Sequence, residues 1–298
     1  MTFKPEGIYP VVPTPFKKDE TLDLESLREL IHYYIEAGVH GVFINGSVGE
    51  YPMLSDDEAK KVINTTLDEA RGKTKVVSGV GTPSTKRTIE MAKYAKDAGV
   101  DGVVIVTPYF YHPTDYGLKE HFIKVARCVE IPIIIYNVPF LSGNKLNPSM
   151  MYRFAEEEYI VGVKDSSGNI FDLTETLRLT PNRISVIIGW DSLLMAGLQM
   201  GAKGGFLGSA AIAPKLLLQL YQATLDKRYE EALQLQKRVH FIMRSMFVGN
   251  FPAGVKAALN LLGLPGGYVR SPLENLKVSE ISRVRYDLER AGILHEFK

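Results

Sequence analysis

The sequence predicts a (β/α)8 barrel, the TIM-barrel fold class, followed by a helical C-terminal extension. Eight short runs rich in β-branched residues recur along the chain. Each run is followed by a polar or glycine-rich turn, and a segment with helical periodicity precedes the next run. Strands that are apolar throughout and separated by helices indicate a parallel sheet covered by helices, because parallel connections need a crossover. Eight such units in about 225 residues fit a closed barrel.

The eight predicted strands are, in chain order, GIYPVV, GVFIN, KVVSGV, GVVIVT, PIIIYN, IVGVK, ISVIIG and GGFLG. The alternative is an open doubly wound sheet, which usually has fewer strands and often carries a glycine-rich nucleotide loop. No GxGxxG pattern occurs in this chain. The count of strands therefore favours the barrel.

Helix boundaries between these strands are also predicted. Ser55 with Glu58 has the spacing of a capping box, and Asn147 followed by Pro148 is a typical helix start. Gly38 and Gly99 each follow an amphipathic segment, where a left-handed C-cap is expected.

Beyond the eighth strand the alternation stops. From Pro214 onward the pattern is helical only, with segments around Tyr229 to Phe247 and near Ser279 to Ala291. We therefore predict a barrel over residues 1–225 and a helical extension over residues 226–298.

Composition excludes several classes of protein. The 298 residues are 45% hydrophobic, and 35 basic against 34 acidic residues give a net charge of +1 with no basic block. Nucleic acid is therefore not an expected partner. The single cysteine, Cys128, is expected to be a small core residue and fits a reducing compartment. No signal core and no run of about 18 apolar residues is present, which predicts a cytoplasmic protein without a membrane partner.

The active site of a (β/α)8 barrel lies at the carboxyl ends of its strands. The segments at those ends are NGSVGE, TPYFYHP, YNVPFLSG, KDSSGN, GWDS and GSAA. Lys164 is the one lysine among them, whereas Lys75 and Lys203 precede their strands. The apolar run before Lys164 would partly desolvate its amine, which favours the free base that attacks a carbonyl.

Tyr136 ends the preceding strand, and a hydroxyl beside an imine-forming lysine can transfer the protons that carbinolamine formation requires. Lys164 and Tyr136 together suggest a Schiff-base enzyme. The alternative is a lysine at the barrel rim paired with Asp165. The small residues Gly46, Ser47 and Val48 form a tight turn whose backbone N–H groups can converge on an anion.

With these motifs the chain resembles the superfamily of dihydrodipicolinate synthase and N-acetylneuraminate lyase, the pyruvate-dependent class I aldolases. The resemblance extends from GIYPVVPTPF through GSVGE, TPYFYHP, YNVP and GVKDSSGN to FPAGVKAALNLLGLPGGYVRSPL. It implies an imine between Lys164 and pyruvate, proton transfer by Tyr136, and a carboxylate held by Ser47 and Val48. It also implies a homotetramer with no metal and no organic cofactor.

Three positions depart from the superfamily pattern. Val48 stands where a threonine is usual, and Phe110 stands where many members have a relay tyrosine. Leu141 stands where dihydrodipicolinate synthases have an arginine that grips aspartate semialdehyde. Loss of that bidentate partner should weaken binding of a carboxylate.

The motif YNVPFLSGNKL is similar to that of sugar-acid lyases, which predicts cleavage of a 2-keto-3-deoxy sugar acid such as 2-keto-3-deoxygluconate into pyruvate and a hydroxyaldehyde. The expected substrate-binding residues are Gly46, Ser47, Val48, Ser166, Gly189, Asp191, Phe206 and Ser209. Ser, Asp and Gly are also common turn residues, so these positions have a purely structural interpretation as well.

The sequence is also compatible with other functions. The same motifs fit dihydrodipicolinate synthase, a related 2-keto acid lyase or dehydratase, or a non-catalytic binding relative. A pyridoxal-phosphate enzyme would need a phosphate cradle, for which no strong candidate is visible. A metal-dependent aldolase would need clustered ligands, and the six histidines are scattered without ligand spacing.

Overall fold

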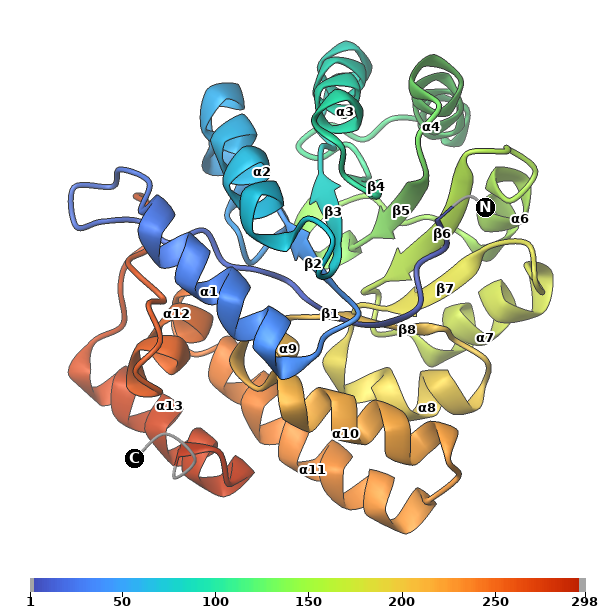
Figure 1. Cartoon of the computed structure of the whole chain (residues 1–298). Helices are drawn as coiled ribbons and strands as arrows, with labels where there is room; N and C mark the ends of the chain where they lie inside the picture. The colour runs from blue at the N-terminus through green and yellow to red at the C-terminus, as the bar shows by residue number, and fades with distance from the viewer. Residues whose placement is uncertain (1–2, 295–298) are drawn as a thin grey trace. The chain divides into compact units, whose positions relative to one another are not determined.

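The computed structural model describes residues 3–294 and has the predicted fold class, a (β/α)8 barrel with additional C-terminal helices (Figure 1). The eight strands are parallel neighbours in the order β1-β8-β7-β6-β5-β4-β3-β2. They are β1 (Gly7–Pro10), β2 (Gly41–Ile44), β3 (Lys75–Gly79), β4 (Gly102–Val106), β5 (Ile133–Asn137), β6 (Ile160–Asp165), β7 (Ser185–Ile188) and β8 (Gly204–Leu207). All eight strands predicted from the sequence are confirmed.

Two compact units divide the chain. The first comprises residues 3–7 with Val77–Phe206, and the second comprises Ile8–Val76 with residues 207–294. The helices of the first unit are α3 (Thr85–Ala98), α4 (Asp115–Val129), α5 (Pro139–Ser142), α6 (Pro148–Phe154), α7 (Ile170–Leu179) and α8 (Leu194–Gln199), with the 3-10 turn η2 (Asp191–Leu193).

The first unit is a parallel sheet with a layer of helices. Its inner strands are buried along their whole length, which is the expected pattern for strands covered on both faces. Helix α3 packs against α4, α4 against α6, and α6 against α7, and in Figure 1 these helices follow one another along the outside of β4–β7. The amphipathic helices thus bury their apolar faces on the sheet.

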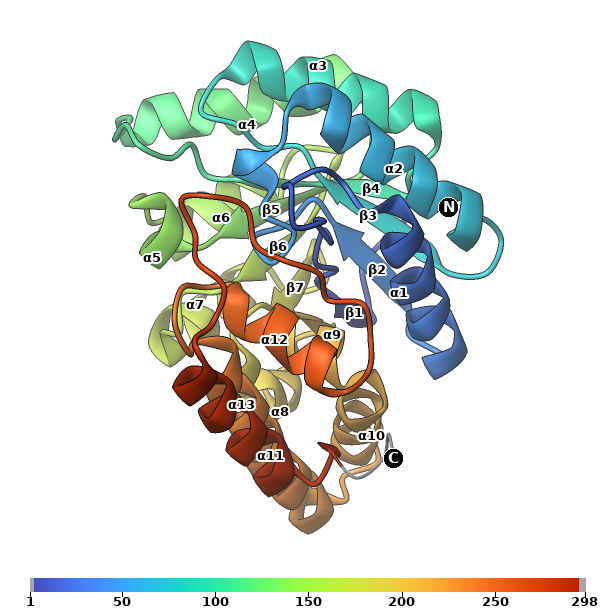
Figure 2. The ribbon, with the colours of Figure 1, turned by 90° about the vertical axis from the view of Figure 1, so that its left-hand side faces the viewer.

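The second unit contains β2 and the remaining helices of the described residues. They are α1 (Leu24–Ala37), α2 (Asp56–Ala70), α9 (Gly208–Ile212), α10 (Pro214–Leu225), α11 (Tyr229–Met246), α12 (Ala253–Leu261) and α13 (Val278–Ala291), with the 3-10 turn η1 (Tyr51–Met53). Helix α11 packs against α10, α12 and α13, and Figure 2 shows α13 lying along α11. The predicted division at residue 225 coincides with the end of α10, and it stays a prediction.

Several predicted boundaries are confirmed. Ser55 and Glu58 form the expected capping box at the start of α2, with both reciprocal hydrogen bonds present. Gly38 and Gly99 end α1 and α3 in the left-handed region, at φ 81° and 101°. Pro148 is the first residue of α6.

The prediction for Cys128 is wrong. Its side chain is exposed on α4 rather than buried in the core. The neighbours Val125, Ala126 and Val129 supply the buried face of the helix, and position 128 falls on the opposite face.

None of the helices formed by residues 3–294 has the length and apolar character needed to cross a membrane.

Candidate active site

Lys164 lies near the carboxyl end of β6 and is buried, with 2% of its surface exposed. In the sheet register it is paired with Tyr136 of β5 on one side and with Ile187 of β7 on the other. Its Nζ atom lies 3.9 Å from the centroid of the Tyr136 ring. The ring face is electron-rich and attracts a positively charged or polar N–H group, so this contact holds the side-chain nitrogen close to the tyrosine.

The turn after β6 is held by a buried polar network. Asn137 Nδ2 donates to one oxygen of Asp165 at 3.0 Å, and the Ser167 N–H and hydroxyl both donate to the other, at 2.9 and 2.6 Å. The Ser166 N–H donates to the Asn137 carbonyl at 2.8 Å. Both carboxylate oxygens of Asp165 thus accept hydrogen bonds from residues of the turn and of β5. These bonds fix the backbone next to Lys164.

Ser166 and Gly189 lie beside Lys164. A Cβ atom added to Gly189 would lie 2.7 Å from Lys164 Cε and would overlap Ser166 Oγ. Only glycine therefore allows the three residues to converge. Ser166 is buried, and its hydroxyl makes no hydrogen bond to any other residue in the described part of the chain. A buried hydroxyl without a partner costs free energy that a bound polar ligand would recover.

Asp191 and Phe206 are also buried within the first unit. Asp191 begins the 3-10 turn η2 directly after Trp190, and Phe206 lies inside β8. The Trp190 ring packs edge-on against Phe140 with centroids 5.5 Å apart, and it covers Gly168. Sequence reasoning missed this aromatic pair, because its two members follow different strands.

The loop from Gly46 to Glu50 follows β2 in the second unit. The Glu50 and Tyr51 N–H groups bond back to the carbonyls of Ser47 and Gly46, at 3.2 and 3.3 Å. A side chain on Gly46 would meet Val11 and Phe43, so close packing requires glycine at this position.

Val48 is buried at the centre of this loop. Its N–H makes no hydrogen bond to another residue within the described range. The Val48 side chain lies near Gly208. A Cβ atom added to Gly208 would lie 3.7 Å from Val48 Cγ2 and would overlap the Met246 side chain. Ser209, which follows Gly208 in α9, is completely buried. The second unit thus brings Val48 and Gly208 together, and Ser209 follows directly in the chain.

Phe110 and Leu141 are the two other positions at which the sequence is predicted to depart from the superfamily pattern. Phe110 is 83% exposed, has a φ of 77°, and packs edge-on against Tyr111. Leu141 lies in α5 and is 47% exposed, so its side chain reaches solvent.

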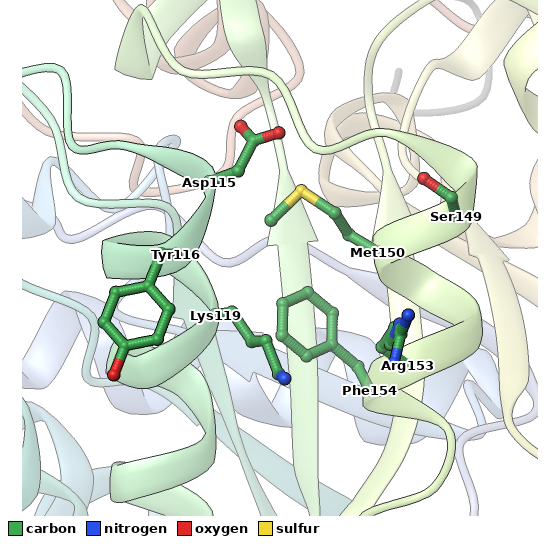
Figure 3. Close-up of a pocket in the computed structure, with 7 residues that line it drawn as sticks. All are labelled: Asp115, Tyr116, Lys119, Ser149, Met150, Arg153 and Phe154. Atoms are coloured by element: carbon green, nitrogen blue, oxygen red, sulfur yellow. The ribbon is translucent and has the colours of Figure 1, made fainter.

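A separate pocket lies between α4 and α6 (Figure 3). Its lining residues are Asp115, Tyr116, Lys119, Ser149, Met150, Arg153 and Phe154. None of the predicted site residues contributes to it.

The geometry around Lys164 defines a class of protein. A buried lysine against a tyrosine, at the carboxyl end of a strand in a (β/α)8 barrel, is the arrangement of an enzyme that forms an imine with a carbonyl substrate.

Comparison with known proteins identifies the family. The model of the dihydrodipicolinate synthetase family matches residues 4–291, and the chain belongs to this family. It is therefore a class I, pyruvate-dependent Schiff-base enzyme of the lyase or aldolase type. The predicted resemblance is confirmed.

Two relatives illustrate the match. The 4-hydroxy-tetrahydrodipicolinate synthase of Methanopyrus kandleri is 37% identical over 298 residues, which cover 99% of each chain. An uncharacterized DapA-like lyase of Halobacterium salinarum is 37% identical over 288 residues, covering 97% of this chain and 94% of the relative.

Solved structures agree with these relatives. Dihydrodipicolinate synthase from Thermotoga maritima has a TM-score of 0.93 at 32% identity, covering 98% of this chain and 100% of the other. A prophage protein of the dihydrodipicolinic acid synthase family from E. coli K12, in complex with pyruvate, has a TM-score of 0.93 at 28% identity. That match covers 97% of this chain and 99% of the other.

Proposed function

We propose that this protein joins pyruvate to an aldehyde, or cleaves the product, through an imine on Lys164. The observation that carries the proposal is the position of the buried Lys164 amine, 3.9 Å from the centre of the Tyr136 ring. A binding protein without catalytic activity would need neither an amine nor a hydroxyl at this point.

The chemistry follows from these two groups. The Lys164 amine adds to the C2 carbonyl of pyruvate, and Tyr136 transfers protons so that the carbonyl oxygen leaves as water. The protonated imine then accepts electrons when C3 loses a proton, which gives an enamine. The enamine attacks the aldehyde carbon, and hydrolysis of the resulting imine regenerates the amine. Cleavage of the product is the reverse sequence.

The loop after β2 is the proposed site for the pyruvate carboxylate. The Val48 N–H is available for a ligand, because none of the described residues accepts a hydrogen bond from it. Ser47, next to it, is a partly exposed residue that carries a hydroxyl. A concave turn of backbone N–H groups favours an anion. Val48 contributes no hydroxyl, so the proton transfer falls to Tyr136.

The aldehyde partner has two candidates. The relatives named 4-hydroxy-tetrahydrodipicolinate synthase favour aspartate semialdehyde, the second substrate that the family resemblance implies. The comparisons do not support the expected 2-keto-3-deoxygluconate, and we place the synthase reaction first. The second candidate is a hydroxyaldehyde, because the exposed Leu141 supplies no cation for a second carboxylate.

Trapping with borohydride tests the imine. Reduction in the presence of pyruvate should attach the substrate to Lys164, as detected by peptide mass mapping. Lys164→Ala should abolish labelling, whereas Lys203→Ala, which changes a lysine preceding β8, should leave labelling unchanged. Labelling of a different lysine, or of none, would contradict the mechanism.

A competition assay tests the aldehyde. kcat/KM for pyruvate with aspartate semialdehyde is compared with kcat/KM for pyruvate with glyceraldehyde. A clear preference for aspartate semialdehyde supports the synthase and means that some group other than residue 141 binds its carboxylate. A preference for glyceraldehyde supports the sugar-acid reaction.

We also propose that the protein is a cytoplasmic homotetramer, which the family resemblance implies. Light scattering of the purified protein tests the oligomeric state, and cell fractionation tests the compartment.

A further inference from the structure

A second buried lysine lies in the second unit, outside the proposed chemistry. Lys256 of α12 and Glu50, which ends the loop after β2, form an ion pair with Nζ and Oε1 2.5 Å apart. Their side chains are 2% and 1% exposed. Removing two charges from water costs free energy that the attraction between them need not fully return, so such a pair is weak evidence for a role in stability. It calls for another explanation.

The partners of the pair show what it connects. Lys256 Nζ also donates to the Tyr268 carbonyl at 2.6 Å and lies over the Phe16 ring at 4.4 Å. The other oxygen of Glu50 accepts from the Arg270 N–H at 3.0 Å. Both oxygens of Glu50 are therefore held by residues of the C-terminal helical region.

The backbone at Glu50 is itself unusual. Its φ of 53° is in the left-handed region, which a non-glycine residue adopts only where its surroundings hold it. The Glu50 N–H closes the turn onto the Ser47 carbonyl, and the Gly49 carbonyl accepts from the Thr14 hydroxyl at 2.7 Å. A shift of Glu50 would therefore move the N–H groups of Ser47, Val48 and Gly49.

We propose that the Glu50–Lys256 ion pair is a positioning device by which the C-terminal extension sets the conformation of residues 46–50 and so the affinity for the pyruvate carboxylate. This inference rests on the proposed function of that loop. Glu50 and Lys256 are positioning residues, because neither is assigned to contact the substrate.

The ionisation of Lys256 adds a pH dependence. Burial, with a smaller effect of the nearby Arg270, lowers the pKa of Lys256 to about 8 against the opposing effect of Glu50. Glu50 and Arg270 are the charged groups that act on it, and the Tyr268 carbonyl and the Phe16 ring complete its surroundings. As the pH rises through about 8, Lys256 loses its charge, and Glu50 loses its ionic partner while keeping the hydrogen bond from the Arg270 N–H. KM for pyruvate should rise over the same range.

Two variants test the proposal directly. Glu50→Gln keeps the shape of the side chain and removes its charge, and Lys256→Met keeps the apolar stem and removes the ammonium. Each should raise KM for pyruvate by about 10-fold, with a much smaller change in kcat and in KM for the aldehyde. The double variant should be less impaired than Lys256→Met alone, because it leaves no buried carboxylate without an opposite charge. Arg244→Met, which removes a half-exposed partner of Asp287 in the same unit, is the matched control and should keep the wild-type KM.

Hydrogen exchange distinguishes this inference from the proposed function. Amides of residues 46–50 should exchange faster in Glu50→Gln than in the wild type, whether or not the enzyme uses pyruvate. Failure of borohydride trapping in the wild type would refute the proposed function alone. Unchanged exchange together with an unchanged KM in Glu50→Gln would overturn the positioning role. If Lys256→Met does not fold, Lys256→Arg replaces it: this variant should remove the rise in KM above pH 8, and persistence of that rise would also count against the proposal.

Discussion

Glycine at position 189 is required for the observed position of the Lys164 side chain. Because a Cβ atom there would lie 2.7 Å from Lys164 Cε and overlap Ser166 Oγ, Gly189→Ala should push the amine away from the Tyr136 ring. We expect a fall in kcat/KM of about 100-fold, since a misplacement of about 1 Å at a reacting group has an effect of this size.

The measurement is the rate of borohydride trapping together with kcat/KM. Gly117→Ala is the matched control, because an added Cβ on this residue of α4 would make only ordinary contacts, at 3.4 Å to Pro113 and 3.5 Å to Thr114. Trapping by Gly189→Ala at the wild-type rate would show that the lysine has another route to the substrate.

Two lysines of the chain, Lys164 and Lys256, lie in apolar stretches of the sequence. Lys164 stands out because it ends an apolar run, and the structure places it beside Tyr136. Lys256 stands in the equally apolar stretch AGVKAALNLL. Its partner Glu50 lies far away in the chain, and no local pattern connects the two. A charged residue in an apolar run therefore indicates a buried partner without identifying it.

Among the helices, α4 carries a pH-sensitive contact. His121 is buried on α4, and its Nδ1 atom lies 2.9 Å from the Thr85 hydroxyl at the start of α3. Burial lowers the pKa of His121 from 6.5 to about 4. The folded state thus prefers the neutral ring, whereas the unfolded chain takes up a proton at about pH 6.5.

The effect on stability follows from this difference. The stabilisation that neutral, buried His121 gives the folded state is fully present above pH 6.5. It is lost as the pH falls from 6.5 toward 4, and the free energy of unfolding decreases by about 3 kcal/mol over this range. Urea unfolding at pH 7.5, 5.5 and 4.5 measures it. His121→Gln should flatten the dependence over this range, and His240→Gln, which changes an exposed residue of α11, should leave it as in the wild type. Equal slopes for wild type and His121→Gln would contradict the prediction.

Elements could be predicted because their signals are local. Each strand is an apolar run with its own turn residues, and the caps at Gly38 and Ser55 are set by neighbours within four positions. Cys128 shows the limit of such signals, because one helical turn decides between the buried and the exposed face. The network of Asn137, Asp165 and Ser167 lay beyond sequence reasoning, because it depends on the register between β5 and β6.

For the whole molecule, the fold class could be predicted because eight repeated units leave few ways to pack a parallel sheet. The C-terminal extension was predicted as helices, but its contacts were not. Arg270 lies between α12 and α13, in a stretch without helical or strand periodicity, and still makes contacts with Glu50 and Glu58. The sequence of an irregular segment has no periodic pattern of apolar residues from which its contacts could be predicted.

The contacts of Arg270 should stabilise the fold. Its guanidinium donates to both oxygens of Glu58, at 2.9 and 2.7 Å, and to the carbonyls of Met53 and Glu20, and it lies over the Phe16 ring. Arg270→Met should lower the free energy of unfolding at pH 7 by about 2 kcal/mol, because four acceptor oxygens, on Glu58, Met53 and Glu20, lose a charged donor. The quarter-exposed Glu58 is screened by solvent, which keeps the loss below that of a fully buried pair.

The pH dependence identifies the cause of that loss. The hydrogen bonds from Arg270 are the largest effect on Glu58, and together with those from Ser55 they lower its pKa from 4.5 to about 2. The stabilisation is therefore present above pH 4.5 and is lost as the pH falls toward 2. The difference between wild type and Arg270→Met in urea unfolding should be constant from pH 7 to 5 and should shrink below pH 4.5. Arg178→Met, which breaks an equally bidentate but exposed pair with Glu175 on α7, should show little change at any pH. A difference that stays constant down to pH 3 would mean that Arg270 acts through packing on Phe16 rather than through Glu58.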